Sequence, residues 1–168
     1  MIKLSNTSKM PCKSWSLQAI ATCPGSIDPE TGDLVNACKG CYATDGFYLM
    51  GPAVASREHN REDWKRDNWV DDMVYQLRNQ SLFRWFDSGD MYSVKLARKI
   101  LEVMRQTPHV KHWLPTRMHK FRKFEKVIDA MNALENVVVR FSSDDIDGTV
   151  IPGRFTSTII DPERPDQV

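Results

Sequence analysis

The sequence lacks long apolar runs and an excess of charge of either sign. None of its apolar runs is long enough to cross a bilayer, and its first residues, MIKLSNTSKMPCKSW, lack the apolar stretch of a secretion signal. Lys and Arg number 23 against 22 Asp and Glu, a balance that gives no general attraction to nucleic acid or membranes. We therefore expect a cytoplasmic protein without a membrane partner, and nothing indicates a nucleic-acid partner.

Cysteine is scarce, and it is confined to the start of the chain. The four cysteines are Cys12, Cys23, Cys38 and Cys41, and none follows. In a reducing compartment these should be free thiols rather than disulfides. Because cysteines that serve only the core would rarely gather in this way, their clustering favours a metal site.

The remaining chain repeats one pattern: an apolar strand, a polar corner and an amphipathic helix. Phe83, Trp113 and Val139 mark successive strands about 30 residues apart, the length of a βα unit. A chain of 168 residues suits one domain, residues 1–168, and is too short for a closed eight-stranded barrel of about 250 residues. We predict an α/β fold, a partial (βα) barrel or an open, mainly parallel sheet of four or five strands. Strands are expected at 14–21, 82–86, 109–115, 136–144 and 154–160, and helices at 61–79, 94–106 and 121–134.

Polar residues follow the predicted strands where each of them ends. Since parallel strands bring their carboxyl ends to one edge, these residues should face one cleft, with the cysteine-rich loop folded over it. Capping of the following helices by Ser, Thr and Asp is the simpler alternative for about half of them. The candidate cofactor-binding residues are Ser88, Gly89, Asp90, Thr116, Arg117 and Ser142. The run VVV at 137–139 also predicts a sheet that is buried on both faces.

The cysteine spacing, C-x10-C-x14-C-x2-C, leaves three kinds of site open. Structural zinc sites usually combine two closely spaced pairs, and only Cys38 and Cys41 form one here. Iron–sulfur clusters accept wider spacing within a loop. A thioredoxin-like redox pair would leave Cys23 without a role. The spacing favours an iron–sulfur cluster, with zinc and redox thiols as alternatives.

Several other groups have a structural explanation. Trp64, Trp69, Trp85 and Trp113 are expected in the core. In the basic run RMHKFRKFEK at 117–126, Lys120, Arg122, Lys123 and Lys126 are expected on the solvated face of a helix whose phenylalanines point inward, rather than on a nucleic acid backbone. The run SSDDID at 142–147 is expected to be a capped corner rather than a cation site.

Six stretches resemble a phage-encoded family, the gene product 88-like domain: SKMPCKSWSLQA, TCPGS, CKGCYA, FRWFDSGDMYS, HWLPTR and VVVRFSSD. CKGCYA also resembles the end of the cluster loop of radical S-adenosylmethionine proteins. The resemblance implies a viral protein with a 4Fe–4S cluster on a partial barrel similar to theirs. Cys23, Cys38 and Cys41 would then ligate the cluster, and Ser88–Asp90 would occupy the place of the motif that meets the amino group of S-adenosylmethionine.

Two functional classes remain. With three cysteine ligands, one iron is open to S-adenosylmethionine, and the protein is a radical enzyme or a descendant of one with a small-molecule substrate. With Cys12 as the fourth ligand, it is an electron carrier with a redox partner, or a structural cluster or zinc module. A strand over 14–21 would carry the chain roughly 25 Å from Cys12, so we expect Cys12 to lie apart.

Overall fold

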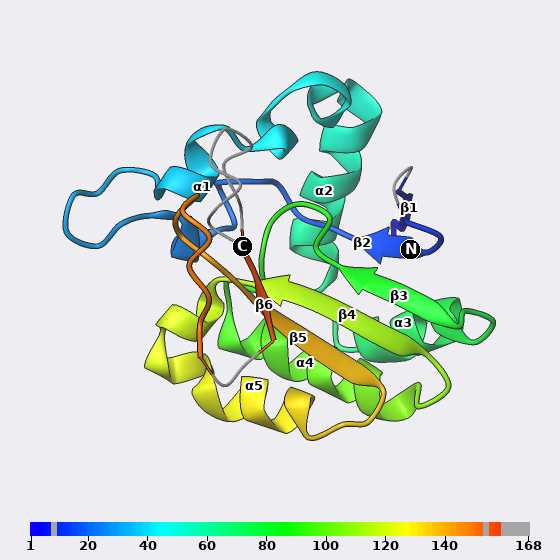
Figure 1. The fold of residues 1–168 in the computed structure, drawn as a ribbon. Helices are drawn as coiled ribbons and strands as arrows, with labels where there is room; N and C mark the ends of the chain where they lie inside the picture. The colour runs from blue at the N-terminus through cyan, green and yellow to red at the C-terminus, as the bar shows by residue number, and fades with distance from the viewer. Residues whose placement is uncertain (8–9, 153–154, 159–168) are drawn as a thin grey trace.

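The strands of the sheet follow one another in space in the order in which they occur along the chain (Figure 1). The computed structural model describes residues 1–7, 10–152 and 155–158, and within these it contains six strands in one sheet and five α-helices. The strands are β1 (Ser5–Asn6), β2 (Lys13–Trp15), β3 (Leu82–Trp85), β4 (Lys111–Thr116), β5 (Val137–Ser142) and β6 (Thr156–Ser157). The helices are α1 (Asn36–Lys39), α2 (Gly51–Asp63), α3 (Trp69–Leu77), α4 (Val94–Gln106) and α5 (Glu125–Asn132).

The sheet is mostly parallel. Each neighbouring pair from β2 to β6 is parallel, and β1 pairs antiparallel with β2. These pairings confirm the predicted α/β fold with an open, mainly parallel sheet. The described sheet has more strands than the four or five predicted because β1, where no strand was predicted, pairs with β2 through two residues. Of the predicted strand at 154–160, residues 156–157 form β6, while 154, 159 and 160 lie outside the described residues.

The βα units lie close to their predicted places. Helix α4 has the predicted bounds, and β3, β4 and β5 lie within two residues of theirs. The strand predicted at 14–21 is much shorter, because the chain leaves β2 after Trp15 and turns at Ile20, where φ is 63°. Helix α5 starts later than predicted because residues 122–124 form a tighter 3₁₀ turn.

The single helix predicted over 61–79 is wrong, because the chain breaks between α2 and α3. Trp64 and Trp69 are both buried, and five residues of continuous helix would turn them about 140° apart. Ending α2 at Asp63 lets both rings reach the core. The break is held by Arg66, which pairs with Asp63 at 2.8 Å and with Asp72 at 2.7 Å. Among the described helices, none combines the length and apolar character that a bilayer crossing requires.

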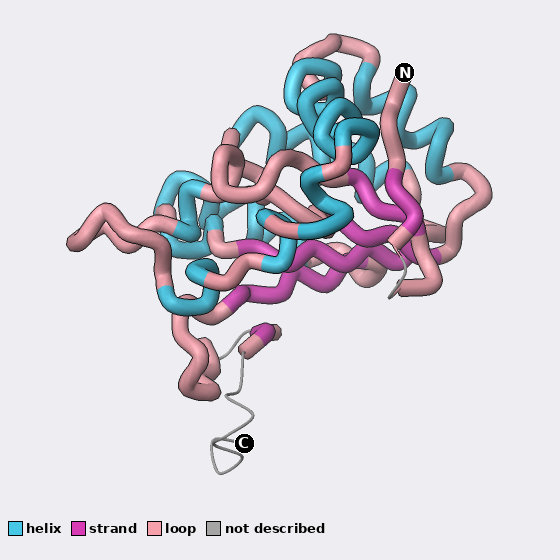
Figure 2. The backbone as a smooth tube through the Cα atoms, turned by 90° about the horizontal axis from the view of Figure 1, so that it is seen from above, coloured by secondary structure: helices cyan, strands magenta, loops and turns pink. Residues whose placement is uncertain are grey.

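One face of the sheet carries the hydrophobic core. In β3 and β4, Phe83, Trp85 and Leu114 are buried, while the residues between them are less so. The buried stripe of α4 packs into the same core, and the ring of Trp15 meets Trp69 edge-on at 5.3 Å between centroids. Figure 2 shows most helical segments on one side of the sheet. Burial of this face is the main stabilisation of the fold.

The other face of the sheet is partly open, so the predicted burial of both faces is wrong. Val138 is 39% exposed, and Arg140 beside it is also exposed. Arg84, Trp113 and Val138 pair in one row across β3, β4 and β5, and therefore share this face. We call this side of β3–β5 the open face. Trp113 is only half-buried here, unlike Trp64, Trp69 and Trp85, for which the core prediction is confirmed.

Candidate functional site

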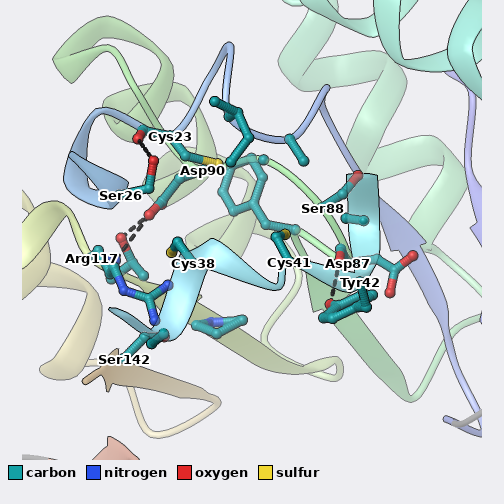
Figure 3. A pocket seen from close by; sticks show the side chains of 18 of the residues that line it. Cys23, Ser26, Cys38, Cys41, Tyr42, Asp87, Ser88, Asp90, Arg117 and Ser142 are labelled. Carbon is teal, nitrogen blue, oxygen red and sulfur yellow. Dashed lines mark hydrogen bonds between the residues drawn. The ribbon is translucent and has the colours of Figure 1, made fainter. Parts of the chain in front are cut away.

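A cavity of about 400 Å³ lies where the strands end, lined on one side by the open face and on the other by the segment that carries three of the cysteines. Figure 3 shows its labelled side chains around a common space. The sequence-predicted residues among its lining are Cys23, Cys38, Cys41, Ser88, Gly89, Asp90, Thr116, Arg117 and Ser142. The structure thus brings these candidates together, and the binding of a cofactor by them stays a prediction.

Cys12 does not line this cavity. It directly precedes β2, at the amino end of the sheet, and its charged neighbour is Arg84. Burial raises the pKa of its thiol, and Arg84 opposes that rise. The other three cysteines follow β2 at its carboxyl end, so the structure places Cys12 apart from them.

The cysteine segment, residues 22–43, is not the featureless loop that its composition suggests. It contains the turn Pro24–Ser26, a bridge between Ile27 and Leu34, and the short helix α1. Ser26 closes the first turn by donating a 2.6 Å hydrogen bond to the carbonyl of Cys23. Cys38 lies within α1, and the amide of Cys41 donates back to its carbonyl at 3.2 Å. This C-x-x-C turn points two sulfurs to the same cavity.

The three thiols are electrostatically linked. Burial raises the pKa of the Cys23 thiol to about 12, and Asp90, Cys38 and Cys41 add to the rise. Burial also raises the pKa of Cys38, while the positive charge of Arg117 opposes this. The thiol of Cys23 is therefore harder to deprotonate than an ordinary cysteine, and a positively charged ligand beside it would oppose this rise in pKa.

Asp90 joins the corner after β3 to the end of β4. Its carboxylate accepts hydrogen bonds from the Thr116 hydroxyl at 2.7 Å, the Arg117 amide at 2.9 Å and the Met91 amide at 2.7 Å. Burial raises its pKa to about 6, although these hydrogen bonds favour the charged form. Both oxygens already have donors, so the carboxylate acts first as a brace beneath the cavity.

Two glycines allow the close packing around this corner. Gly89 has a φ of +78°. A β-carbon there would lie 2.6 Å from the Thr22 hydroxyl and 2.7 Å from Leu17 Cβ. One at Gly25 would lie 2.6 Å from Arg117 Cβ. Glycine is therefore required in both CPG and SGD, where the cysteine segment meets the sheet.

An ion-pair network joins the cysteine segment to the end of β5. Lys120 contacts the Asp144 carboxylate at 2.6 Å and donates to the Gly25 carbonyl at 3.2 Å. Arg117 lies 3.3 Å from the same carboxylate and donates to the Ser143 carbonyl at 2.6 Å. The prediction that Lys120 lies on a solvated face is therefore wrong, because its ammonium group is held by these two contacts. Asp144, in the corner at 142–147, is the ion-pair partner of Lys120.

Sequence reasoning did not single out Tyr42, Arg84 and Trp113 as site residues, although they line the cavity, nor Tyr48, which packs against Tyr42. The Tyr42 and Tyr48 hydroxyls donate to Asp87, to its carbonyl at 2.7 Å and its carboxylate at 2.9 Å. The Arg84 guanidinium lies over the Trp113 ring, 4.8 Å from its centroid. The alternation of Arg84 and Trp113 with buried strand neighbours is the signal that could have placed them on the open face.

Among the residues that the structure describes, no three His, Cys, Asp or Glu side chains form a group that could hold a metal ion. The three cavity cysteines therefore do not form such a group. Residues 2–165 match the sequence profile of a protein family described as gene product 88, which covers nearly the whole chain. No curated protein and no solved structure matches the chain.

Proposed function

The chain belongs to the gene product 88 family, and on that basis we propose that it binds one 4Fe–4S cluster through Cys23, Cys38 and Cys41. The observation that carries this proposal is that these three thiols, one from the start of the cysteine segment and two from its end, line one cavity while the fourth cysteine does not. Soft thiolate ligands suit Cu(I), zinc and iron–sulfur clusters, and the last two are the metal sites that the cysteine spacing leaves open.

The arrangement of the thiols favours a cluster over zinc. A structural zinc ion usually takes four ligands from two closely spaced pairs, and only Cys38 and Cys41 form such a pair in this sequence. A cube of iron and sulfide is larger than one ion, and it fills the space between ligands that stand further apart. The cavity of about 400 Å³ has room for it.

The electrostatic surroundings also suit a thiolate-bound cluster. Arg117 lies close enough to Cys38 to favour its thiolate form, and it is itself held by Ser143 and Asp144. Cys38 is buried, which limits the access of water to the bound group. These features hold the ligands in place and compensate their negative charge.

The place of Cys12 favours the enzyme class over the electron carrier. With Cys12 away from the cavity, the described cysteines leave one iron without a protein ligand. When bound, such a cluster supplies an electron to a molecule held at its open iron. S-adenosylmethionine is our candidate for that molecule, and it would lie along the Ser88–Gly89 backbone. Asp90 supports that backbone from below rather than offering a free carboxylate.

Anaerobic reconstitution with iron and sulfide, in the presence of an equal amount of zinc, tests the metal. We expect iron and sulfide to be retained together, with broad thiolate-to-iron absorbance at about 400 nm. The resonance spectrum of the reduced protein should then change when S-adenosylmethionine is added. Retention of zinc without iron would overturn the cluster. A cluster whose spectrum ignores S-adenosylmethionine would overturn the choice of that molecule.

A further inference from the structure

The part of the cavity on the open face contains an arginine whose hydrogen-bonding capacity is largely unused. The Arg84 side chain is only 15% exposed, yet its polar contacts with the described residues are long. It lies 3.4 Å from the Asp87 carboxylate and 3.5 Å from the Tyr42 hydroxyl. A guanidinium carries five N–H donors, so most of them remain available.

Two donors here have no partner among the described residues. Nε of Arg84 and Nε1 of Trp113 are both buried and without a hydrogen bond. Buried donors without partners cost free energy, and both side chains line the cavity, where the terminal nitrogens of Arg84 have only the two long contacts above. The two side chains also stack, which fixes the guanidinium in the cavity wall.

Asp87 pairs with Arg84 only loosely, because its carboxylate is also hydrogen-bonded to Tyr48. One carboxylate oxygen accepts the Tyr48 hydroxyl at 2.9 Å, and Arg57 holds Tyr48 by donating to its carbonyl at 2.8 Å. Asp87 is thereby drawn toward the segment that follows Cys41, and its other oxygen meets Arg84 only at 3.4 Å.

The rest of the lining is largely apolar. Its apolar side chains come from Ala19, Ile20, Ala37, Ala43, Phe86 and Pro115. Such a wall favours an organic body over a bare inorganic ion, because apolar surface gains little from a fully hydrated anion.

We propose that Arg84 and Trp113 form the subsite for the carboxylate of a small organic acid, whose apolar body lies along this wall. The guanidinium supplies the paired donors that match a carboxylate. This proposal deepens the proposed function, on which it rests, by giving the class of substrate held beside the cluster site.

Titration with benzoate tests the subsite, with the Trp113 indole N–H signal followed by ¹H–¹⁵N nuclear magnetic resonance. The variant Trp113→Phe assigns that signal among those of the five tryptophans. We expect a saturable shift with benzoate, and binding weaker by about tenfold or more for neutral benzamide. Equal binding of benzoate and benzamide, or equal binding of inorganic phosphate, would overturn the proposal.

Two arginines on the same face provide a matched pair of variants. Arg84→Gln should weaken benzoate binding by about tenfold or more. Arg140→Gln should leave it unchanged, because Arg140 donates to the Thr156 carbonyl and does not line the cavity. The other indole signals report whether each variant is folded. If Arg84→Gln is not, Arg84→Lys keeps the charge but loses the planar fork, and should also bind more weakly. Wild-type affinity in a folded Arg84 variant would contradict the subsite.

The titration is run before and after reconstitution with iron and sulfide. Benzoate binding without iron uptake would overturn the cluster and leave the subsite in place. Iron uptake without benzoate binding would overturn only the subsite.

Discussion

Gly25 lies directly against Arg117, so that a β-carbon on Gly25 would stand 2.6 Å from Arg117 Cβ and 2.8 Å from the Arg117 carbonyl oxygen. The contact joins the turn after Cys23 to the corner after β4. It sets how closely the cysteine segment can approach the sheet.

Gly25→Ala should therefore push the cysteine segment away from the sheet. We expect a loss of about 1–3 kcal/mol in unfolding free energy, as for other overpacked contacts, together with lower iron uptake. Gly51→Ala is the control, because nothing lies within 4 Å of a β-carbon there and Gly51 does not line the cavity. Urea denaturation compares the two, and equal stabilities would show that the turn can move without cost.

Asp90→Asn tests the brace beneath the cavity. In the wild type, the Met91 and Arg117 amides each donate to one carboxylate oxygen of Asp90. The Asn side chain keeps one oxygen, but its NH₂ group would face the other backbone amide, so that two donors would meet. We expect a loss of about 1–3 kcal/mol. Thr116→Val removes one hydrogen bond to this carboxylate and the one that the Met118 amide donates to the Thr116 hydroxyl. It leaves both backbone donors of the carboxylate in place and should cost less. A larger loss for Thr116→Val than for Asp90→Asn would mean that the carboxylate is not the brace.

His112 should make stability fall as the pH drops. Burial lowers its pKa to about 4 from an ordinary value of 6.5. Its Nδ1 accepts from Trp85 Nε1 at 3.2 Å, so Nε2 carries the proton and faces the Thr107 hydroxyl at 2.9 Å. The unfolded chain therefore binds a proton below about pH 6.5 that the folded protein takes up only near pH 4.

The expected loss of unfolding free energy from this histidine is roughly 2 kcal/mol between about pH 7.5 and about pH 5. Denaturation at both pH values, in the wild type and in His112→Gln, isolates it from the titration of carboxylates. The variant should show the smaller pH dependence. An identical pH dependence in the two proteins would contradict a neutral, buried His112.

The sequence predicts the sheet well where neighbouring residues show a clear pattern of apolar and polar side chains. The unit from Leu82 to Thr116 combines an apolar strand, a polar corner and an amphipathic helix, and each part needs the others to bury its apolar side. The common edge of parallel strands then follows from topology, which is why Ser88 and Thr116 were expected beside the same cavity.

The remaining features depend on tertiary contacts that periodicity does not reveal. Helix α2 buries polar side chains, Arg57, Asn60 and Asp63, so its first part has no apolar stripe to detect. Asn60 donates to the carbonyls of Lys3 and Ser16, which tie α2 to the start of the chain. The open face was missed for a related reason. The strand that carries Arg84 is too short to show which of its faces the helices cover.

The most direct test of the proposed cluster site compares four cysteine variants after anaerobic reconstitution. Iron content and the resonance spectrum of the reduced protein are measured for Cys12→Ser, Cys23→Ala, Cys38→Ala and Cys41→Ala. We expect Cys12→Ser to match the wild type in both, because Cys12 does not line the cavity. Each of the other three should lose the cluster, since each removes a ligand. Full iron content in Cys38→Ala, or loss of the cluster in Cys12→Ser, would contradict a site built from three cysteines.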